Sequence, residues 1–226
     1  MNSSIEHIHD FSLPSRVRLS NTRSPELLLF LLHSSYTDES SFEKWVQFID
    51  PRITIVMPRA LFPVKESSKK MMWFRASFTS SEPIIDSSQA EQSRVKLISY
   101  IKEVQNNLHL DGKNTVIAGF SQGGVLSASL ALTEPKLVQG FSILSGRILP
   151  EINECIGPIR DLYHLRALVC HGTMDELLSV QWANKSRESL SNLGIDTSFI
   201  LDQYKHELNQ ITISHLNHWL IKYFLQ

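Results

Sequence analysis

Short runs of consecutive apolar residues constrain the fold of this chain more than any other feature of its sequence. The clearest are residues 26–33 (ELLLFLLH) and 53–57 (ITIVM). A strand that is apolar on both faces lies inside a parallel sheet, because helices cover such a sheet above and below. Further runs of this kind, the last of them more polar, occupy residues 115–120, 140–145, 165–171 and 196–202.

Segments with helical periodicity separate these apolar runs along the chain. They cover residues 41–49, 88–108, 122–133, 180–193 and 207–224. Strands that alternate with helices in this way pair in parallel through right-handed crossovers. The sequence therefore predicts a three-layer α/β fold. A chain of 226 residues with 42% hydrophobic side chains is large enough for one such domain, so residues 1–226 are expected to form a single domain.

Charge, apolar length and cysteine content exclude several classes of protein. The 22 basic and 23 acidic side chains give a formal net charge of −1, which offers no electrostatic basis for binding nucleic acid. The longest apolar run is too short to span a bilayer, and the first residues lack an apolar leader, so a cytoplasmic protein without stable membrane insertion is expected. Cys155 and Cys170 match no disulfide framework or metal spacing. Both are expected to be buried as small apolar side chains.

One long stretch, residues 58–85, shows no clear periodicity. Part of it, MMWFRASF at 71–78, is too apolar for a flexible linker. Loops of this length inside compact domains often serve as lids or binding loops, so a substrate-binding loop is predicted. The residues expected to contact substrate are Met71, Met72, Trp73 and Phe74. The alternative, that the segment only covers the edge of the sheet, is left open.

The sequence GFSQGG at 119–124 places Ser121 between a predicted strand and the helix after it. Ligands of open α/β sheets bind beyond the carboxyl ends of the strands, where this serine lies. In a Gly-x-Ser-x-Gly turn, Gly119 and Gly123 remove the Cβ atoms that would clash where strand and helix meet. A capping serine or a phosphate-binding loop is the alternative, but the phosphate motifs are absent. Ser121 is predicted to be a nucleophile, with the Gln122 N–H as an oxyanion donor.

A serine nucleophile needs a histidine base, and a carboxylate must orient that histidine. Asp175 follows the apolar run 165–171 and is predicted to be the acid, with a helix N-cap as its alternative role. Glu176 is adjacent, but neighbouring side chains point in different directions. Among nine histidines, His206 follows the acid and lies between the last strand and the final helix. It is predicted to be the general base.

The other histidines have simpler interpretations. His215 and His218 belong to the final helix, and His33 and His171 are expected to be turn residues at strand ends. The remaining four are expected at the surface or near the terminus: His7, His9, His109 and His164. No histidine–carboxylate spacing matches a zinc-binding helix, so no metal is expected.

The motifs GFSQGG, HGTMD (171–175) and SGRILPE (145–151) together resemble the phospholipase/carboxylesterase family of α/β-hydrolases. That family includes acyl-protein thioesterases and small bacterial carboxylesterases. The resemblance runs from about residue 28 to about residue 220 and includes Trp73-Phe74. It implies an α/β-hydrolase fold in which Ser121 is the nucleophile, Asp175 the orienting acid and His206 the general base, without a cofactor. The substrates it implies are small esters, thioesters or lysophospholipids.

Two positions depart from the family's pattern. The loop after the first buried strand usually carries His-Gly and a further glycine, whereas this chain has His33-Ser34-Ser35-Tyr36, with Ser35 as the matching oxyanion donor. Glycine usually precedes the catalytic histidine, and here that position holds Lys205, a cation that would disfavour imidazole protonation at short range.

These departures keep a second function open. A catalytically weak or inactive protein with the same fold could bind a lipid or protein partner. The motifs also leave the acyl donor and its chain length undecided, because pocket shape selects among esters, thioesters and lysophospholipids. They do not decide between a monomer and a homodimer.

Overall fold

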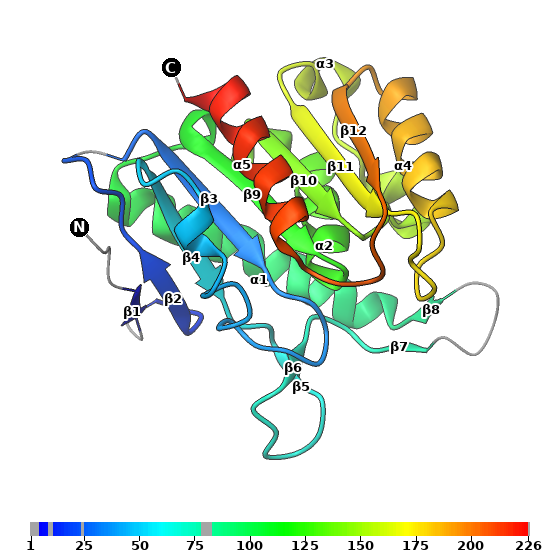
Figure 1. The fold of residues 1–226 in the computed structure, drawn as a ribbon, viewed down its shortest axis with the longest axis horizontal. Coiled ribbons are helices and arrows are strands. Elements are labelled where there is room, and N and C mark those ends of the chain that lie inside the picture. Colours follow the sequence, from blue (N-terminus) through cyan, green and yellow to red (C-terminus); the bar gives the residue numbers. More distant parts are fainter. Residues whose placement is uncertain (1–4, 9–10, 24, 78–82, 226) are drawn as a thin grey trace.

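An eight-stranded sheet forms the centre of the protein (Figure 1). The computed structural model describes residues 5–8, 11–23, 25–77 and 83–225. The strand order is β1-β2-β4-β3-β9-β10-β11-β12, and the strands from β4 onward in that order pair in parallel, while β1 and β2 form an antiparallel edge. The strands are β1 (Ile5–Ile8), β2 (Ser15–Arg18), β3 (Leu27–Leu32), β4 (Ile53–Pro58), β9 (Thr115–Phe120), β10 (Gly140–Leu144), β11 (Arg166–Gly172) and β12 (Asp196–Asp202).

Helices cover both faces of this sheet. On one face lie α1 (Ser87–Leu108), α2 (Gln122–Thr133), α3 (Ile159–Leu162) and α4 (Gln181–Asn192), and on the other lies α5 (Gln210–Phe224), drawn in red in Figure 1. In β3, alternate leucines join different layers: Leu28 and Leu32 pack toward α1 and α2, and Leu29 packs toward α5. Two-sided burial explains the continuous apolar runs. The three-layer α/β prediction is therefore confirmed.

Most elements lie where the periodicity predicts them. The bounds of β9, α2 and β12 match the predicted residues, and the other buried strands and the helices α1, α4 and α5 differ from prediction by a few residues at their ends. The antiparallel edge, β1 and β2, was not predicted. Those two strands are short and carry charged residues, a pattern typical of sheet edges that resists further pairing.

The helix predicted at 41–49 is wrong. Turns occupy residues 41–45, and only a short 3-10 helix, η1 (Val46–Phe48), follows. The buried guanidinium of Arg18 donates hydrogen bonds to four carbonyls at the end of this segment and just beyond it, where the chain turns toward β4. The acceptors are the carbonyls of Val46, Ile49, Asp50 and Ile53, at 2.6–2.8 Å. Burial lowers the pKa of Arg18 to about 10.

The predicted loop at 58–85 contains short strand pairs. The hairpin of β5 (Phe62–Pro63) and β6 (Met71–Met72) projects from the body of the protein, at the bottom of Figure 1. A second pair joins β7 (Ala76–Ser77) to β8 (Ile84–Ile85). Residues 78–82 of this predicted loop lie outside the described part of the chain.

The two cysteines differ in exposure. Cys170 is buried in β11, and burial raises the pKa of its thiol to about 11. Cys155 is exposed, so its predicted burial is wrong. It is the last residue of the 3-10 helix η4 (Pro150–Cys155), of which only Ile152 is buried. Separately, none of the helices in the described residues is long and apolar enough to cross a bilayer.

Candidate active site

Three side chains meet at the carboxyl edge of the sheet. Ser121, Asp175 and His206 follow β9, β11 and β12 respectively. The Ser121 Oγ lies 3.0 Å from His206 Nε2, and His206 Nδ1 lies 2.7 Å from Asp175 Oδ2. The carboxylate accepts the Nδ1 proton, which leaves Nε2 as the acceptor for the serine hydroxyl. In such a series a serine could act as nucleophile, the histidine as its base and the carboxylate as the group that orients the histidine.

The backbone at Ser121 is strained. Its φ is 55° and its ψ is −116°, a conformation that side-chain-bearing residues rarely adopt. Neighbouring glycines permit it, because a Cβ on Gly119 would lie 2.2 Å from the Gly123 carbonyl carbon, and one on Gly123 would lie 2.0 Å from the Leu32 oxygen. The Ser121 hydroxyl makes no helix-capping hydrogen bond. It is therefore available to His206.

Asp175 accepts three hydrogen bonds and lies close to a fourth nitrogen. Its Oδ1 accepts the N–H groups of Leu177 and Leu178, at 3.0 and 2.8 Å, and its Oδ2 accepts His206 Nδ1–H. His171 Nε2 lies 3.3 Å from the same Oδ2. Burial acts to raise the pKa of Asp175, but the hydrogen bonds, led by those from the two histidines, outweigh it and hold the pKa below the ordinary value. The carboxylate therefore stays ionised.

Asp175 does not cap the next helix, since α4 begins at Gln181 with Val180 as its N-cap. The neighbouring Glu176 is exposed, whereas the Asp175 side chain is fully buried. Only Asp175 of the two carboxylates is in contact with His206.

His171 differs from its prediction as a turn residue. It lies within β11 and is fully buried, and its Nε2–H donates to the Leu178 carbonyl at 2.8 Å. Sequence reasoning missed its contact with Asp175. The signal available was the spacing in HGTMD, because a strand that ends at residue 172 and turns back places residues 171 and 175 near one another.

His206 is half-buried, and its ring packs against Phe120 with ring centroids 5.0 Å apart. Lys205 beside it is exposed. The helix histidines lie elsewhere: His215 Nε2 is 3.3 Å from Asp202 Oδ2, and His218 is exposed. His109 and His164 are exposed, as predicted. The side chain of His7, and all of His9, lie outside the described part of the structure.

Gln122, the first residue of α2, has a backbone N–H without a partner inside the helix. Its buried side chain ties this helix start to the 58–85 segment. The side-chain oxygen accepts the Trp73 N–H at 3.1 Å, and the side-chain nitrogen donates to the Phe74 carbonyl at 2.7 Å.

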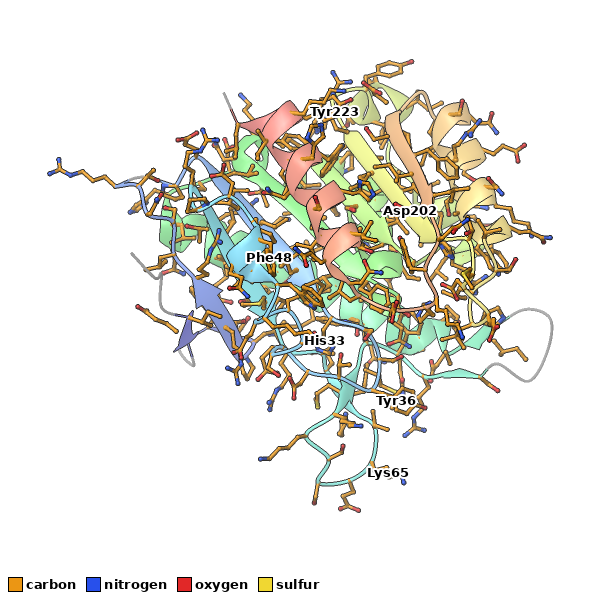
Figure 2. The ribbon with its side chains drawn as sticks, viewed as in Figure 1. His33, Tyr36, Phe48, Lys65, Asp202 and Tyr223 are labelled. Atoms are coloured by element: carbon orange, nitrogen blue, oxygen red, sulfur yellow. The ribbon has the colours of Figure 1, made fainter. Side chains whose placement is uncertain are left out.

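The loop that carries Ser35 begins at a buried histidine. His33 was predicted to be a turn residue, but its side chain is fully buried, and its Nε2 accepts the Ala60 N–H at 3.0 Å. That bond places the proton on Nδ1, which donates to the Ser34 carbonyl at 2.7 Å. Burial lowers the pKa of His33 to about 4, so the ring is neutral. Figure 2 shows His33 and Tyr36 at the sheet edge above the β5–β6 hairpin.

Two hollows flank Ser121 and Gln122, and they share Phe74, Ala76 and Gln122 as lining residues. The first contains Ser121 and is mainly apolar; its other lining residues are Pro83, Ile85, Val125, Arg147, Leu149 and Leu178. The second is more polar, and its other lining residues are Ser35, Tyr36, Val64, Met72 and Arg75.

The four residues predicted to contact substrate therefore fall into two groups, those that line a hollow and those that do not. Phe74 lines both hollows and Met72 lines the second, whereas Met71 and Trp73 are not among the lining residues of either. Trp73 is fully buried, and its indole N–H donates to the His33 carbonyl at 2.8 Å. This contact anchors the segment to the sheet edge, which agrees with the covering role that the sequence left open.

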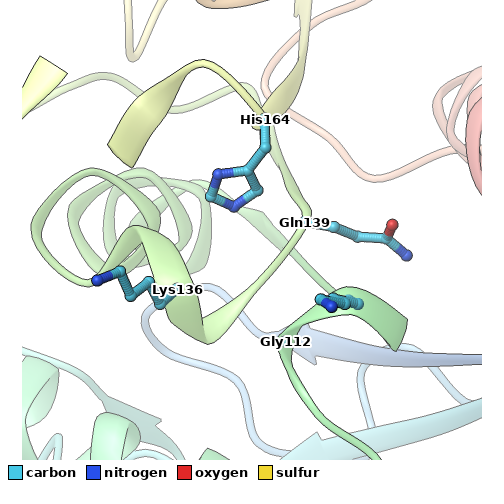
Figure 3. A pocket seen from close by; sticks show the side chains of 5 residues that line it. Gly112, Lys136, Gln139 and His164 are labelled. Atoms are coloured by element: carbon cyan, nitrogen blue, oxygen red, sulfur yellow. The ribbon is translucent and has the colours of Figure 1, made fainter. Parts of the chain in front are cut away.

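A further hollow lies at the opposite edge of the sheet, where β9, β10 and β11 begin (Figure 3). It is lined by Gly112, Lys113, Lys136, Gln139 and His164. The His164 Nε2 already bonds the carbonyls of Pro135 and Val138, so it is not free for proton transfer there. Across the described residues, no group of three His, Cys, Asp or Glu side chains could hold a metal ion.

Comparison with known proteins decides the family. The phospholipase/carboxylesterase family model matches residues 21–223. The chain belongs to the phospholipase/carboxylesterase family. It is therefore a hydrolase of the esterase, thioesterase or lysophospholipase type.

Similar proteins match this chain over almost its whole length. Lysophospholipase-like protein 1 of Mus musculus is 24% identical over 231 residues, which cover 93% of this chain and 94% of the relative. A carboxylesterase from Mesorhizobium loti has the same fold, with a TM-score of 0.81, 22% identity, and coverage of 96% of this chain and 98% of that one. Acyl-protein thioesterase 2 of Zea mays gives a TM-score of 0.74 at 16% identity, covering 92% and 97% of the two chains.

Proposed function

We propose that the protein hydrolyses carboxylic esters or thioesters through Ser121, His206 and Asp175, with a covalent acyl-enzyme intermediate. The observation that carries this proposal is the hydrogen-bonded series from the Ser121 hydroxyl through His206 to the buried Asp175 carboxylate. A serine hydroxyl becomes a useful nucleophile only with such a base in contact.

The reaction proceeds in two halves. Ser121 Oγ attacks the carbonyl carbon while His206 Nε2 takes its proton, and the same Nε2–H then protonates the departing alcohol or thiol as the bond to the acyl carbon breaks. Water next attacks the acyl carbon, His206 accepts the water's proton, and the carboxylic acid leaves as the proton returns to Ser121. The ionised Asp175 stabilises the imidazolium formed in each half.

The oxyanion of each tetrahedral intermediate needs hydrogen-bond donors that are already in place. The Gln122 N–H at the start of α2 supplies one, reinforced by the positive end of the helix dipole. The Ser35 N–H, on the neighbouring loop, supplies the second.

The apolar lining of the hollow that contains Ser121 favours the acyl group of the substrate there, and its volume of about 30 Å³ suits a short chain. Small esters, thioesters and lysophospholipids all present such a group to the same chemistry. Proteins similar to this chain carry names for each class, namely carboxylesterase, acyl-protein thioesterase and lysophospholipase-like protein.

Fluorophosphonate labelling and a hydrolysis panel of esters and thioesters of graded chain length test this function. Wild-type protein should label at Ser121 and turn over, and Ser121→Ala should abolish both while thermal unfolding stays cooperative. His206→Ala should be nearly as damaging, whereas His218→Ala, an exposed control, should retain activity. A folded wild type that neither labels nor turns over would instead indicate a binding protein with this fold.

A further inference from the structure

The Ser34 carbonyl accepts hydrogen bonds from two donors of its own loop. His33 Nδ1–H donates to it at 2.7 Å, and the Thr37 hydroxyl donates to it at 2.7 Å. Because the Ala60 N–H occupies His33 Nε2, the imidazole has only the tautomer that can donate from Nδ1. Both donors therefore hold this one carbonyl oxygen.

That restraint also sets the direction of the next amide. In a planar trans peptide, the carbonyl oxygen and the following N–H point in opposite directions, and no cis peptide occurs in the described chain. The Ser35 N–H consequently points away from the side chains of His33 and Thr37. Within the described residues, no acceptor takes up this N–H, and Ser35 lines the hollow that Gln122 also lines.

We propose that His33 and Thr37 are positioning residues that aim the Ser35 N–H as an oxyanion donor by holding the Ser34 carbonyl. This inference rests on the proposed hydrolytic function. It explains how a loop with serines in place of glycines keeps its donor aligned: hydrogen bonds from side chains select one peptide orientation.

Backbone hydrogen bonds restrain the rest of the loop. Tyr36 has a φ of 63°, an unfavourable conformation for an aromatic residue. A two-bond bridge holds it, with the Tyr36 N–H donating to the Met71 carbonyl at 2.9 Å and the Met71 N–H donating to the Thr37 carbonyl at 2.7 Å.

Hydrogen bonds also connect this loop to Gln122, whose N–H is the other proposed oxyanion donor. Trp73 bonds the His33 carbonyl through its indole N–H, and its backbone N–H is held by the Gln122 side chain. The two proposed oxyanion donors thus belong to one hydrogen-bonded network, and their separation is set by it.

Thr37→Val tests the proposal, because valine keeps the shape of threonine and removes only the donor. We expect kcat for a short-chain ester to fall on the order of 10-fold with KM little changed, since complete loss of an oxyanion donor costs about 10²–10³-fold. The affinity for an alkyl boronic acid, whose tetrahedral serine adduct places an oxygen at the oxyanion position, should fall by a similar factor. Thr37→Ser, the matched control, should restore both because it keeps the hydroxyl.

The outcomes separate this proposal from the proposed function. Wild-type kcat and boronate affinity in a folded Thr37→Val protein would overturn the positioning role alone, as would an equal loss in Thr37→Ser. If Thr37→Val lowers the Tm, Thr37→Ala provides a second hydroxyl-free variant, and losses in both with recovery in Thr37→Ser support the proposal. A wild type inert to fluorophosphonate and to every ester would overturn both proposals.

Discussion

The two sides of the candidate active site are built by different means. Around Ser121, glycine backbones touch neighbouring backbones, and no room exists for a Cβ on Gly119 or Gly123. The loop from His33 to Thr37 has no glycine, and hydrogen bonds from side chains and from distant backbone hold it instead. The first arrangement is all-or-none, because overlap between backbones has no easy relief. The second is graded, since each bond contributes separately and one of them depends on a titratable ring.

The largest effect is expected on the nucleophile side, from Asp175→Asn. An amide favours the wrong imidazole tautomer, so kcat should fall by about 10⁴-fold with little change in KM. Steady-state kinetics with a small activated ester measure it. The exposed neighbour supplies the control, because Glu176→Gln should leave kcat within about twofold. A larger loss in the Glu176 variant would reassign the acid.

The next effect concerns the backbone contact at Gly123. An added Cβ would lie 2.0 Å from the Leu32 carbonyl oxygen, so Gly123→Ala should lower the free energy of unfolding by roughly 3 kcal/mol or more. Urea denaturation measures this change. Gly157→Ala is the control, because its added Cβ would lie 3.0 Å from the nearest atom, a Pro135 ring carbon, and so requires a much smaller shift. If both variants lose the same amount of unfolding free energy, the close backbone contacts around Ser121 do not make that side of the site less tolerant of change.

A pH titration of stability sharpens the comparison. The folded pKa of His33 is about 4, against an ordinary value of 6.5, so protonation favours the unfolded chain. Stability should be unaffected by this group above pH 6.5 and should fall by roughly 3 kcal/mol as the pH drops to 4. Asp175 acts in a lower window: its pKa is depressed below 3.8, so its contribution is present above that pH and is lost below it.

Urea denaturation at pH 7, 5.5 and 4 measures this loss of stability. His33→Gln removes the titrating ring, so this variant, although less stable at pH 7, should show a shallower decline between pH 6.5 and 4. An unchanged decline would assign it to other groups.

The smallest effect is expected at the second hollow. Met72 lines it and Met71 does not, so Met72→Ser should lower kcat/KM for medium-chain esters more than for acetyl esters, and Met71→Ser should not. Each lost methylene contact is worth about 1 kcal/mol. Kinetics across a chain-length series provide the measurement. The same profile in both variants, at unchanged Tm, would argue against a substrate role for this segment.

The predictable part of the fold rests on local pattern. The bounds of β9 and α2 followed from an apolar run that ends at a glycine-rich turn, because strand, turn and helix are contiguous in sequence. The end of the segment at 41–49 could not be predicted in detail, since the carbonyls of Val46 and Ile49 are bonded by Arg18, whose position along the chain carries no periodic signal. The exposure of Cys155 likewise depends on which side of η4 faces solvent.

The candidate site divides along the same line. Ser121, Asp175 and His206 were predicted because parallel strands bring their carboxyl ends to one edge, and chain order then selects among the candidates. The role of His33 could not be predicted, because its partner Ala60 lies on another segment and becomes its neighbour only after the sheet forms. Trp73 was predicted to be a substrate contact from its apolar surroundings, and its burial against the His33 carbonyl is likewise a tertiary contact.

The contacts of Arg18 also bear on the order in which the chain acquires its structure. A helix at 41–49 would close hydrogen bonds between near neighbours in under about a microsecond. The guanidinium instead reaches carbonyls 28 to 35 residues further along the chain, and those bonds form only after β2 has docked on β4. Closing loops of that size is a search over non-local contacts, which is slow compared with local helix formation. The local turns from Asp38 to Phe48 can therefore close early, whereas the contacts that join Arg18 to the carbonyls from Val46 to Ile53 are expected as a late product of sheet assembly.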